Sequence, residues 1–214
     1  MNMIRSPRYL FLALVVAVVP MFLAGCGTSP TPRFYTLQSV TFPEKTDYIS
    51  FKNAKVAVGV GPVEIPDYLD QAQIVTRTDQ NRLVVAEFDL WGGSLKTDVN
   101  RVLVENLSTL LAGDGVSVFS WRAHVPNMHR LPVSLIRFDA APGGKVSLKA
   151  RWAVVGKDNI NLGAMREAVI VKPIKGGQYS DVVAAMSEAL EELSKEMAAD
   201  IKTCLFQDKG IEGK

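Results

Sequence analysis

The sequence predicts an α/β fold: a mixed-sheet sandwich with an antiparallel meander and two main helices, preceded by a signal peptide. Short runs that alternate apolar and polar residues predict strands in both halves of the chain. Two longer stretches place apolar residues every three or four positions, which predicts helices. A hydrophobic content of 48% in 214 residues is enough for one sizeable core. We therefore expect one sheet on which both helices pack.

Four strands are expected before the first helix, at residues 34–37, 56–60, 74–77 and 83–86. A polar loop is expected at 39–53, and the second strand is expected to end at Gly61-Pro62. Thr78-Asp79-Gln80-Asn81 is typical of a hairpin turn between the third and fourth strands. Pro66 removes an amide donor and restricts Ile65, so residues 65–70 are expected to be irregular.

The clearest helix follows Trp91-Gly92-Gly93. Ser94 is a good N-cap residue and Gly113 a good C-terminal stop. A strand is expected at 116–119, so this strand–helix–strand passage can supply a parallel pair. The apolar positions of the helix lie three or four residues apart: Val99, Val102, Leu103, Leu107, Leu110 and Leu111.

Three extended segments follow, at 133–138, 146–155 and 162–172, with short polar turns at 141–144 and 157–159. Such turns favour an antiparallel meander. Gly176-Gly177 ends this region, and Ser180 is expected to cap a long helix that packs back over the sheet. Its apolar stripe consists of Val183, Met186, Leu190, Leu193, Met197 and Ile201.

The N-terminal apolar run, residues 9–23, follows two arginines. About fifteen residues make roughly 22 Å of helix, too short for a bilayer core of ~30 Å. A basic head, a short apolar body and small residues after it are typical of a secretory signal. This interpretation is favoured over a membrane-spanning anchor.

The run ends in Leu23-Ala24-Gly25-Cys26, which resembles the lipobox of bacterial lipoproteins. The resemblance implies cleavage before Cys26, diacylglycerol on its thiol and an acyl chain on its new amino group. Two or three acyl chains hold a protein on a membrane far more firmly than one. Gly27, where an Asp favours inner-membrane retention, points to the outer membrane, facing the periplasm. The alternative is an ordinary signal peptide with an incidental cysteine.

The expected divisions are a signal peptide at 1–25, a lipidated tether at 26–33, one domain at 34–206 and a flexible tail at 207–214. The tether after Cys26 reaches at most ~25 Å, so the domain is expected to sit near the membrane. Removing 25 of 214 residues leaves 189, with 22 basic and 22 acidic side chains, because the removed part holds two Arg and no acid. A neutral chain does not favour nucleic-acid binding.

Candidate chemistry is sparse. His124 and His129 are the only histidines, and without accompanying Cys or carboxylates they predict neither a metal site nor a catalytic triad. Gly59-Val60-Gly61 is followed by Pro62, so the dinucleotide fingerprint fails. No catalytic residue and no cofactor beyond the acyl chains on Cys26 is predicted.

Two features keep open alternatives. The backbone amides of Gly92-Gly93-Ser94 are able to hold an anion, although a simple helix cap is the favoured account. Cys204 has no second thiol to bridge once Cys26 is lipidated; core packing is favoured, with an intermolecular disulfide as the alternative.

Partner contact is predicted for an apolar group on irregular backbone. The group consists of Ile65, Pro66, Tyr68 and Leu69, and the alternative is that this loop folds into its own core.

Several motifs together resemble the auxiliary lipoproteins of ABC-type transport systems, of the PqiC (YmbA) kind. They are Phe34-Tyr35-Thr36-Leu37 after the lipid cysteine, residues 59–70, Ile74-Val75-Thr76-Arg77, Trp91, Arg137-Phe138-Asp139 and residues 146–152. The most specific part runs from Pro66 to Arg77 with Trp91, which adds Trp91 to the contact candidates. Gly92-Gly93 after Trp91 departs from the ordinary helix start that is expected there.

The resemblance implies a non-enzymatic lipoprotein that serves an intermembrane lipid transport or envelope-integrity system. Its implied partners are an MCE-domain protein, the ABC and integral membrane components, and further copies of the chain in a ring. The runner-up hypothesis is a lipoprotein that binds lipid or hydrolyses a substrate itself.

Overall fold

The computed structural model describes residues 30–40, 55–123, 125–141 and 144–206. The signal peptide, Cys26, His124 and the 207–214 tail lie outside the described residues. The chain divides into two units, residues 1–32 and 33–214, and every strand and helix of the described residues belongs to the second.

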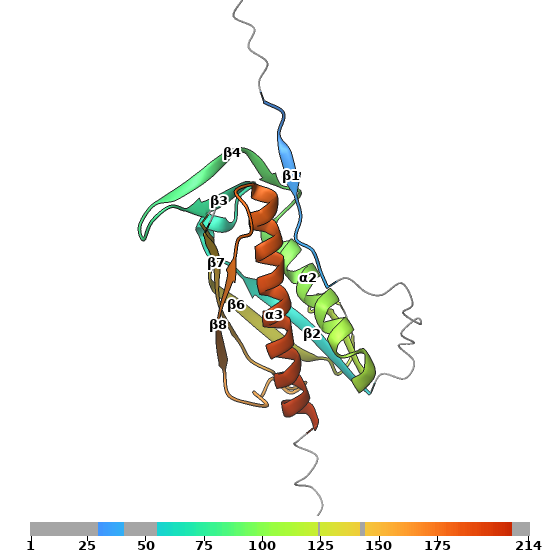
Figure 1. The fold of residues 1–214 in the computed structure, drawn as a ribbon. Coiled ribbons are helices and arrows are strands. Elements are labelled where there is room, and N and C mark those ends of the chain that lie inside the picture. The colour runs from blue at the N-terminus through green and yellow to red at the C-terminus, as the bar shows by residue number, and fades with distance from the viewer. Residues whose placement is uncertain (1–29, 41–54, 124, 142–143, 207–214) are drawn as a thin grey trace, which may run out of the picture. The chain divides into compact units, whose positions relative to one another are not determined.

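A five-stranded sheet has the order β5-β2-β6-β7-β8 (Figure 1). β2 (Val56–Glu64) runs parallel to both β5 (Val116–Ser120) and β6 (His129–Ala140). β6, β7 (Lys145–Trp152) and β8 (Arg166–Pro173) pair antiparallel. The antiparallel meander is therefore confirmed. The parallel pair expected from the strand–helix–strand passage does not form, because β4 and β5 lie in different sheets; β5 pairs in parallel with β2 instead.

A second sheet of three strands has the order β1-β4-β3. β3 (Gln73–Arg77) and β4 (Leu83–Trp91) form the expected hairpin, and β1 (Arg33–Tyr35) lies parallel to β4 on its other edge. The prediction of a single sheet was wrong. Because β1 and β3 occupy both edges of β4, no edge of β4 is left to join the larger sheet.

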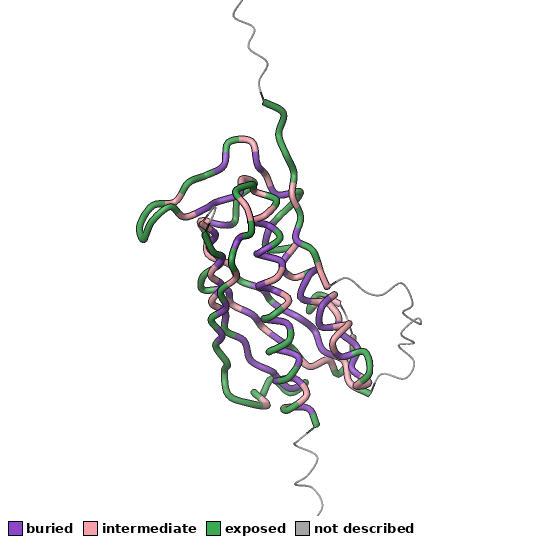
Figure 2. The backbone as a smooth tube through the Cα atoms, in the orientation of Figure 1, coloured by how far each residue is buried: buried purple, intermediate pink, exposed green. Residues whose placement is uncertain are grey.

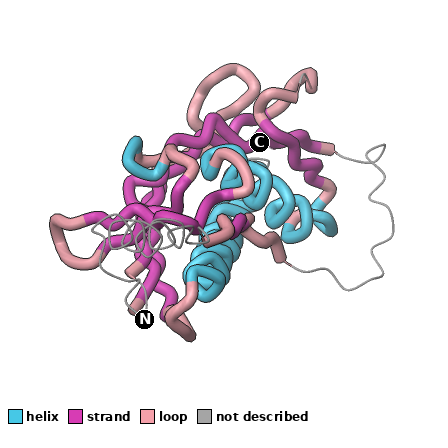
Figure 3. The backbone as a smooth tube through the Cα atoms, turned by 90° about the horizontal axis from the view of Figure 1, so that it is seen from above, coloured by secondary structure: helices cyan, strands magenta, loops and turns pink. Residues whose placement is uncertain are grey.

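Two helices, α2 (Leu95–Leu110) and α3 (Tyr179–Phe206), pack on one face of the five-stranded sheet and against each other (Figure 3). Their apolar stripes are buried except for the partly buried Leu110, as are the facing strand residues (Figure 2). The side chains with 0% exposure include Leu103, Leu107, Leu190, Leu193 and Met197 from the helices, and Val58, Val60 and Leu131 from the sheet. This contact between helices and sheet forms the core.

The helix ends differ from the sequence expectation in detail. Ser94 caps α2, and its hydroxyl accepts from the Thr97 amide at 3.4 Å. The chain continues as a short 3-10 turn, Ala112–Asp114, and Gly115 takes the left-handed conformation expected of Gly113. Ser180 does not cap α3, which starts one residue earlier. Instead the Asp181 carboxylate accepts from the Gln178 amide at 2.9 Å.

β2 does not stop at Gly61-Pro62, as predicted, but continues to Glu64. The Gly61-Pro62 bond is cis, and the register against β6 shifts between Val60 and Val63. The irregularity lets a strand pass through a proline that lacks an amide donor. Gly61 has φ 118°, and a Cβ there would lie 2.2 Å from Cδ1 of Trp121.

Candidate functional site

Residues 33–40, here called the N-terminal strap, join the predicted tether to the domain. The strap begins as β1, where the Gly92 amide donates to the Tyr35 carbonyl at 2.7 Å. The Arg33 guanidinium donates two hydrogen bonds, of 2.8 and 2.7 Å, to the Asp89 carboxylate, and the Tyr35 hydroxyl donates to the same carboxylate at 2.7 Å. Asp89 is only 4% exposed. The hydrogen bond from Arg33 holds the pKa of Asp89 below its ordinary value.

Beyond β1 the strap lies against both helices. The Leu37 amide donates to Asp98 of α2 at 2.7 Å, and the Gln38 amide donates to Ser187 of α3 at 3.0 Å. The Val40 amide donates to Asn106 of α2 at 2.8 Å. The Leu37 side chain is fully buried. The strap is thus an integral part of the helical layer.

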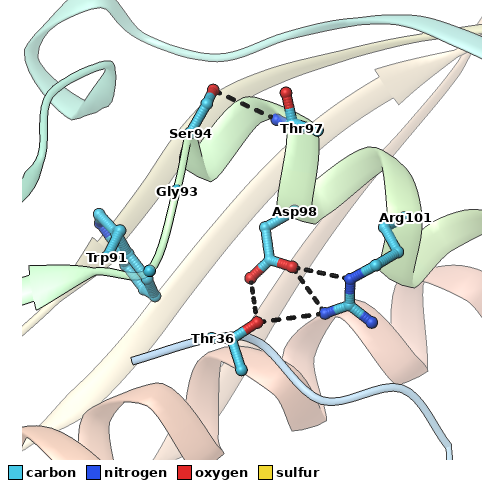
Figure 4. Close-up of a pocket in the computed structure, with 8 residues that line it drawn as sticks. Thr36, Trp91, Gly93, Ser94, Thr97, Asp98 and Arg101 are labelled. Atoms are coloured by element: carbon cyan, nitrogen blue, oxygen red, sulfur yellow. Dashed lines mark hydrogen bonds and ion pairs between the residues drawn. The ribbon is translucent and has the colours of Figure 1, made fainter. Parts of the chain in front are cut away.

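Arg101 closes this contact from α2. Its guanidinium donates to the Leu37 carbonyl at 2.7 Å and to the Asp98 carboxylate at 2.6 Å. Figure 4 shows Asp98 and Arg101 reaching from the helix to Thr36, whose hydroxyl donates to Asp98 at 3.0 Å. A pocket of about 170 Å³ lies beside them, bordered by Trp91.

The Gly92-Gly93-Ser94 corner serves this junction. Gly92 bonds the strap through its amide, and Ser94 caps the helix. Asp98 lies in the first helical turn, where a carboxylate is favourable because of the helix dipole. The cap interpretation of this corner is therefore confirmed.

A second buried carboxylate, Asp139 of β6, ties the two sheets together. It accepts from the Tyr68 hydroxyl at 2.5 Å, from Arg77 of β3 at 2.7 Å and from Arg137 at 2.6 Å. Burial at 5% exposure raises the pKa of Asp139, but the hydrogen bonds from Arg77 and Tyr68 outweigh it and the pKa lies below its usual value. Burial, with the bond to Asp139, raises the pKa of Tyr68 to about 12.

This cluster positions the predicted contact segment, which forms the 3-10 turn η2 (Asp67–Leu69) at its centre. Leu69 and Trp91 are 3% and 5% exposed, so their side chains belong to the core. Ile65, Pro66 and Tyr68 keep part of their surface accessible. The loop therefore contributes to the core and also presents three apolar groups outward.

Most residues of these two carboxylate clusters are visible in the sequence only as parts of motifs, not as interacting pairs. Nothing in the local pattern pairs Tyr68 with Asp139, 71 positions later, or Asp98 with the strap, 61 positions earlier. An acidic residue inside an apolar strand, as in Ile136-Arg137-Phe138-Asp139-Ala140, was the available signal, because a buried carboxylate requires donors.

Metal and acid–base chemistry receives no support from the described residues, which contain no group of three His, Cys, Asp or Glu suited to a metal. His129 lies at the start of β6, and its buried Nδ1 has no hydrogen-bond partner within the described structure. Burial and the charge of Lys157 lower the pKa of His129. Cys204 is half-buried on α3 and packs against the core.

The part of the chain that the structure describes has no helix that could span a membrane. Neither α2 nor α3 combines the length and the apolar character that a membrane-crossing helix needs.

Known proteins are similar to this chain in sequence and in fold. The sequence profile of the family described as "ABC-type transport auxiliary lipoprotein component" matches residues 35–198. The intermembrane transport lipoprotein PqiC of Escherichia coli (strain K12) is 28% identical over 138 residues, which are 64% of this chain and 71% of PqiC. PqiC of Shigella flexneri matches to the same extent.

Two solved structures share the fold. An uncharacterized protein superposes with a TM-score of 0.67 at 21% identity, over 80% of this chain and 99% of its own. A protein from Xanthomonas campestris gives 0.62 at 15% identity, over 84% and 99%. Since the family profile covers well over half of the sequence, this chain belongs to the ABC-type transport auxiliary lipoprotein family.

Proposed function

We propose that the chain is a non-enzymatic, lipid-anchored component of an ABC/MCE-type intermembrane transport or envelope-integrity system. It is anchored through acylated Cys26 in the outer membrane, faces the periplasm, assembles with further copies of itself, and holds an MCE-domain partner near that membrane. The family membership and the PqiC relatives, which are intermembrane transport lipoproteins, support this role.

The observation that carries the proposal is the strap. Seven residues after Cys26 the chain enters β1 and is then bonded to both helices through Asp98, Asn106 and Ser187. A pulling force on the anchor is therefore transmitted through the strap to α2 and α3. Such a junction suits a part that holds an assembly within a short distance of a membrane.

The buried carboxylates support a mechanical role. Asp89 and Asp139 are both engaged by arginine and tyrosine, and their pKa values are lowered rather than raised. A general acid needs the opposite shift at neutral pH. These groups stabilise the fold and leave no proton to exchange there.

The partner contact is assigned to the outward parts of Ile65, Pro66 and Tyr68. Leu69 and Trp91 are buried in the core and are not part of this surface. Because Asp139 fixes Tyr68 and so the turn beneath these groups, the surface is preformed, which lowers the entropy lost on binding.

A crosslinking experiment tests the proposal. A photo-crosslinking amino acid at Pro66, in the full-length lipoprotein expressed in cells, should capture an MCE-domain protein or an ABC-system subunit. The same group at Thr203, exposed on α3, is the matched control. Absence of such a partner from both the crosslinks and a membrane pull-down contradicts the transport role.

The anchor is tested separately. Cys26→Ala should abolish palmitate labelling and leave the precursor uncleaved by the lipoprotein peptidase. Label retained on this variant excludes Cys26 as the sole site of acylation.

A further inference from the structure

The three-stranded sheet carries apolar side chains that the domain does not cover. Phe34 in β1 is 69% exposed, and Val84 and Val85 in β4 are 40% and 50% exposed. Here we call these three residues the apolar rim. Two neighbouring valines face opposite sides of a strand, so the hairpin presents apolar groups on both of its faces.

The position of the rim in the chain indicates what covers it. Phe34 lies eight positions after Cys26, and its strand is paired to β4 from Arg33 onward. A tether that reaches at most ~25 Å keeps β1 close to the surface in which the acyl chains are inserted. No other exposed large apolar residue in the described parts of the chain lies so near the anchor along the sequence.

We propose that the apolar rim rests on the lipid bilayer, with Phe34 as its principal contact. This inference depends on the lipid anchor of the proposed function and adds an orientation to it. The end of the domain that carries the three-stranded sheet then faces the membrane, while α3 ends, at Phe206, at the opposite end of the domain (Figure 1).

The chemistry of the surrounding residues fits a lipid headgroup region. The Arg33 and Arg82 side chains are 61% and 71% exposed and flank the apolar groups. Arginine keeps its charged end in water while its stem lies along apolar surface, and an aromatic ring suits the same boundary. Asp89 and Asp79 pair with these arginines, so the contact depends on apolar area more than on net charge.

Fluorescence quenching in vesicles tests the contact. The mature lipoprotein with Cys204→Ser carries a fluorescent thiol label on Phe34→Cys, or on Val169→Cys as the control. Val169 is 67% exposed and apolar but belongs to β8 of the other sheet. In phosphatidylethanolamine–phosphatidylglycerol vesicles with brominated acyl chains, quenching at position 34 should exceed that at 169 by about threefold or more.

A second variant separates the phenylalanine from the label. With the label on Val84→Cys, Phe34→Ser should lower quenching about twofold or more, while Ile160→Ser should leave it unchanged. Ile160 is 63% exposed and outside the rim, so neither substitution removes a core contact.

The outcomes are distinct. Equal, weak quenching at both sites in protein that floats with the vesicles overturns the rim contact and leaves the anchor intact. Protection of position 34 from iodide without quenching by brominated lipid means that protein covers the rim, and this also overturns the inference. Protein that fails to float with the vesicles contradicts the anchor, and the rim contact falls with it.

Discussion

At the scale of single residues, Asp139 is the most consequential side chain of the described structure. Three donors from three parts of the chain meet on one carboxylate that is 5% exposed. Asp139→Asn should lower the free energy of unfolding by about 3 kcal/mol, because it leaves the partly buried Arg77 without its charge partner. Urea unfolding followed by circular dichroism measures this.

The control for Asp139 is Glu167→Gln. Glu167 also bridges two basic residues, Lys149 and Arg151, but is 37% exposed. Its loss should leave the urea midpoint nearly unchanged, because solvent-exposed ion pairs contribute little to stability. Equal effects of the two substitutions contradict the special role of the buried cluster.

Tyr68 makes stability depend on alkaline pH. Its pKa rises from 10.0 to about 12 on folding, so the protonated hydroxyl is favoured in the folded state. The contribution of the Tyr68 hydroxyl to the free energy of unfolding is fully present below pH 10 and is lost as the pH rises through 12. Tyr68→Phe should cost about 1 kcal/mol at neutral pH, and the difference from the wild type should shrink between about pH 10 and 12. A difference that stays constant across that range counts against the assignment.

Gly61 is the glycine whose conformation and surroundings both forbid a side chain. Its φ is 118°, and an added Cβ meets the Trp121 ring at 2.2 Å. Gly61→Ala should destabilise the domain by about 2 kcal/mol or more in thermal unfolding. Gly93→Ala is the matched control, since nothing lies within 4 Å of its Cβ position, and a loss comparable to that of Gly61→Ala would refute the steric argument.

At the scale of elements, the strap is held to α2 chiefly through Asp98. Asp98→Ala removes the acceptor of the Leu37 amide and the partner of Arg101. Amide hydrogen exchange at Leu37 should accelerate about tenfold, the equivalent of roughly 1.4 kcal/mol. Glu105→Ala is the control, because it removes the other partner of Arg101 on the same helix without touching the strap. Equal acceleration of exchange at the Leu37 amide in both variants contradicts the role of Asp98.

The helices and the meander were predictable because their periodicity is local. The stripe from Val183 to Ile201 and the turns at 141–144 and 157–159 need no knowledge of distant residues. The separation into two sheets was not predictable, since it depends on the pairing of β1 with β4, in which Arg33 lies opposite Asp89. The candidate site was foreseen as a set of motifs, but the buried pairs that define it join residues with no local relation. Propensity and pattern carry no information on such pairs.

At the scale of the whole molecule, tether length separates two reasons for the domain to lie near a membrane. A short tether holds any domain close to the membrane, whereas the rim contact adds an affinity of the three-stranded sheet for the bilayer. A flexible chain spreads as the square root of its length, so repeating residues 27–32 raises the mean height of an undocked domain only about 1.4-fold. With the rim docked, quenching of a label on Val84→Cys should fall by less than about half, because the apolar contact of Phe34 persists.

The repeated tether should leave the thermal unfolding midpoint and palmitate labelling unchanged, since the strap begins after it and Cys26 is untouched. If quenching at position 84 instead falls to the value at 169, the tether alone accounts for the proximity. Combining the repeat with Phe34→Ser, with the label on Val84→Cys in every variant, completes the cycle. If Phe34→Ser lowers quenching more in the repeated-tether variant than in the original, the aromatic side chain makes the contact with the bilayer. The reason is that a longer tether holds the domain near the membrane less firmly, so that its position depends more on the rim.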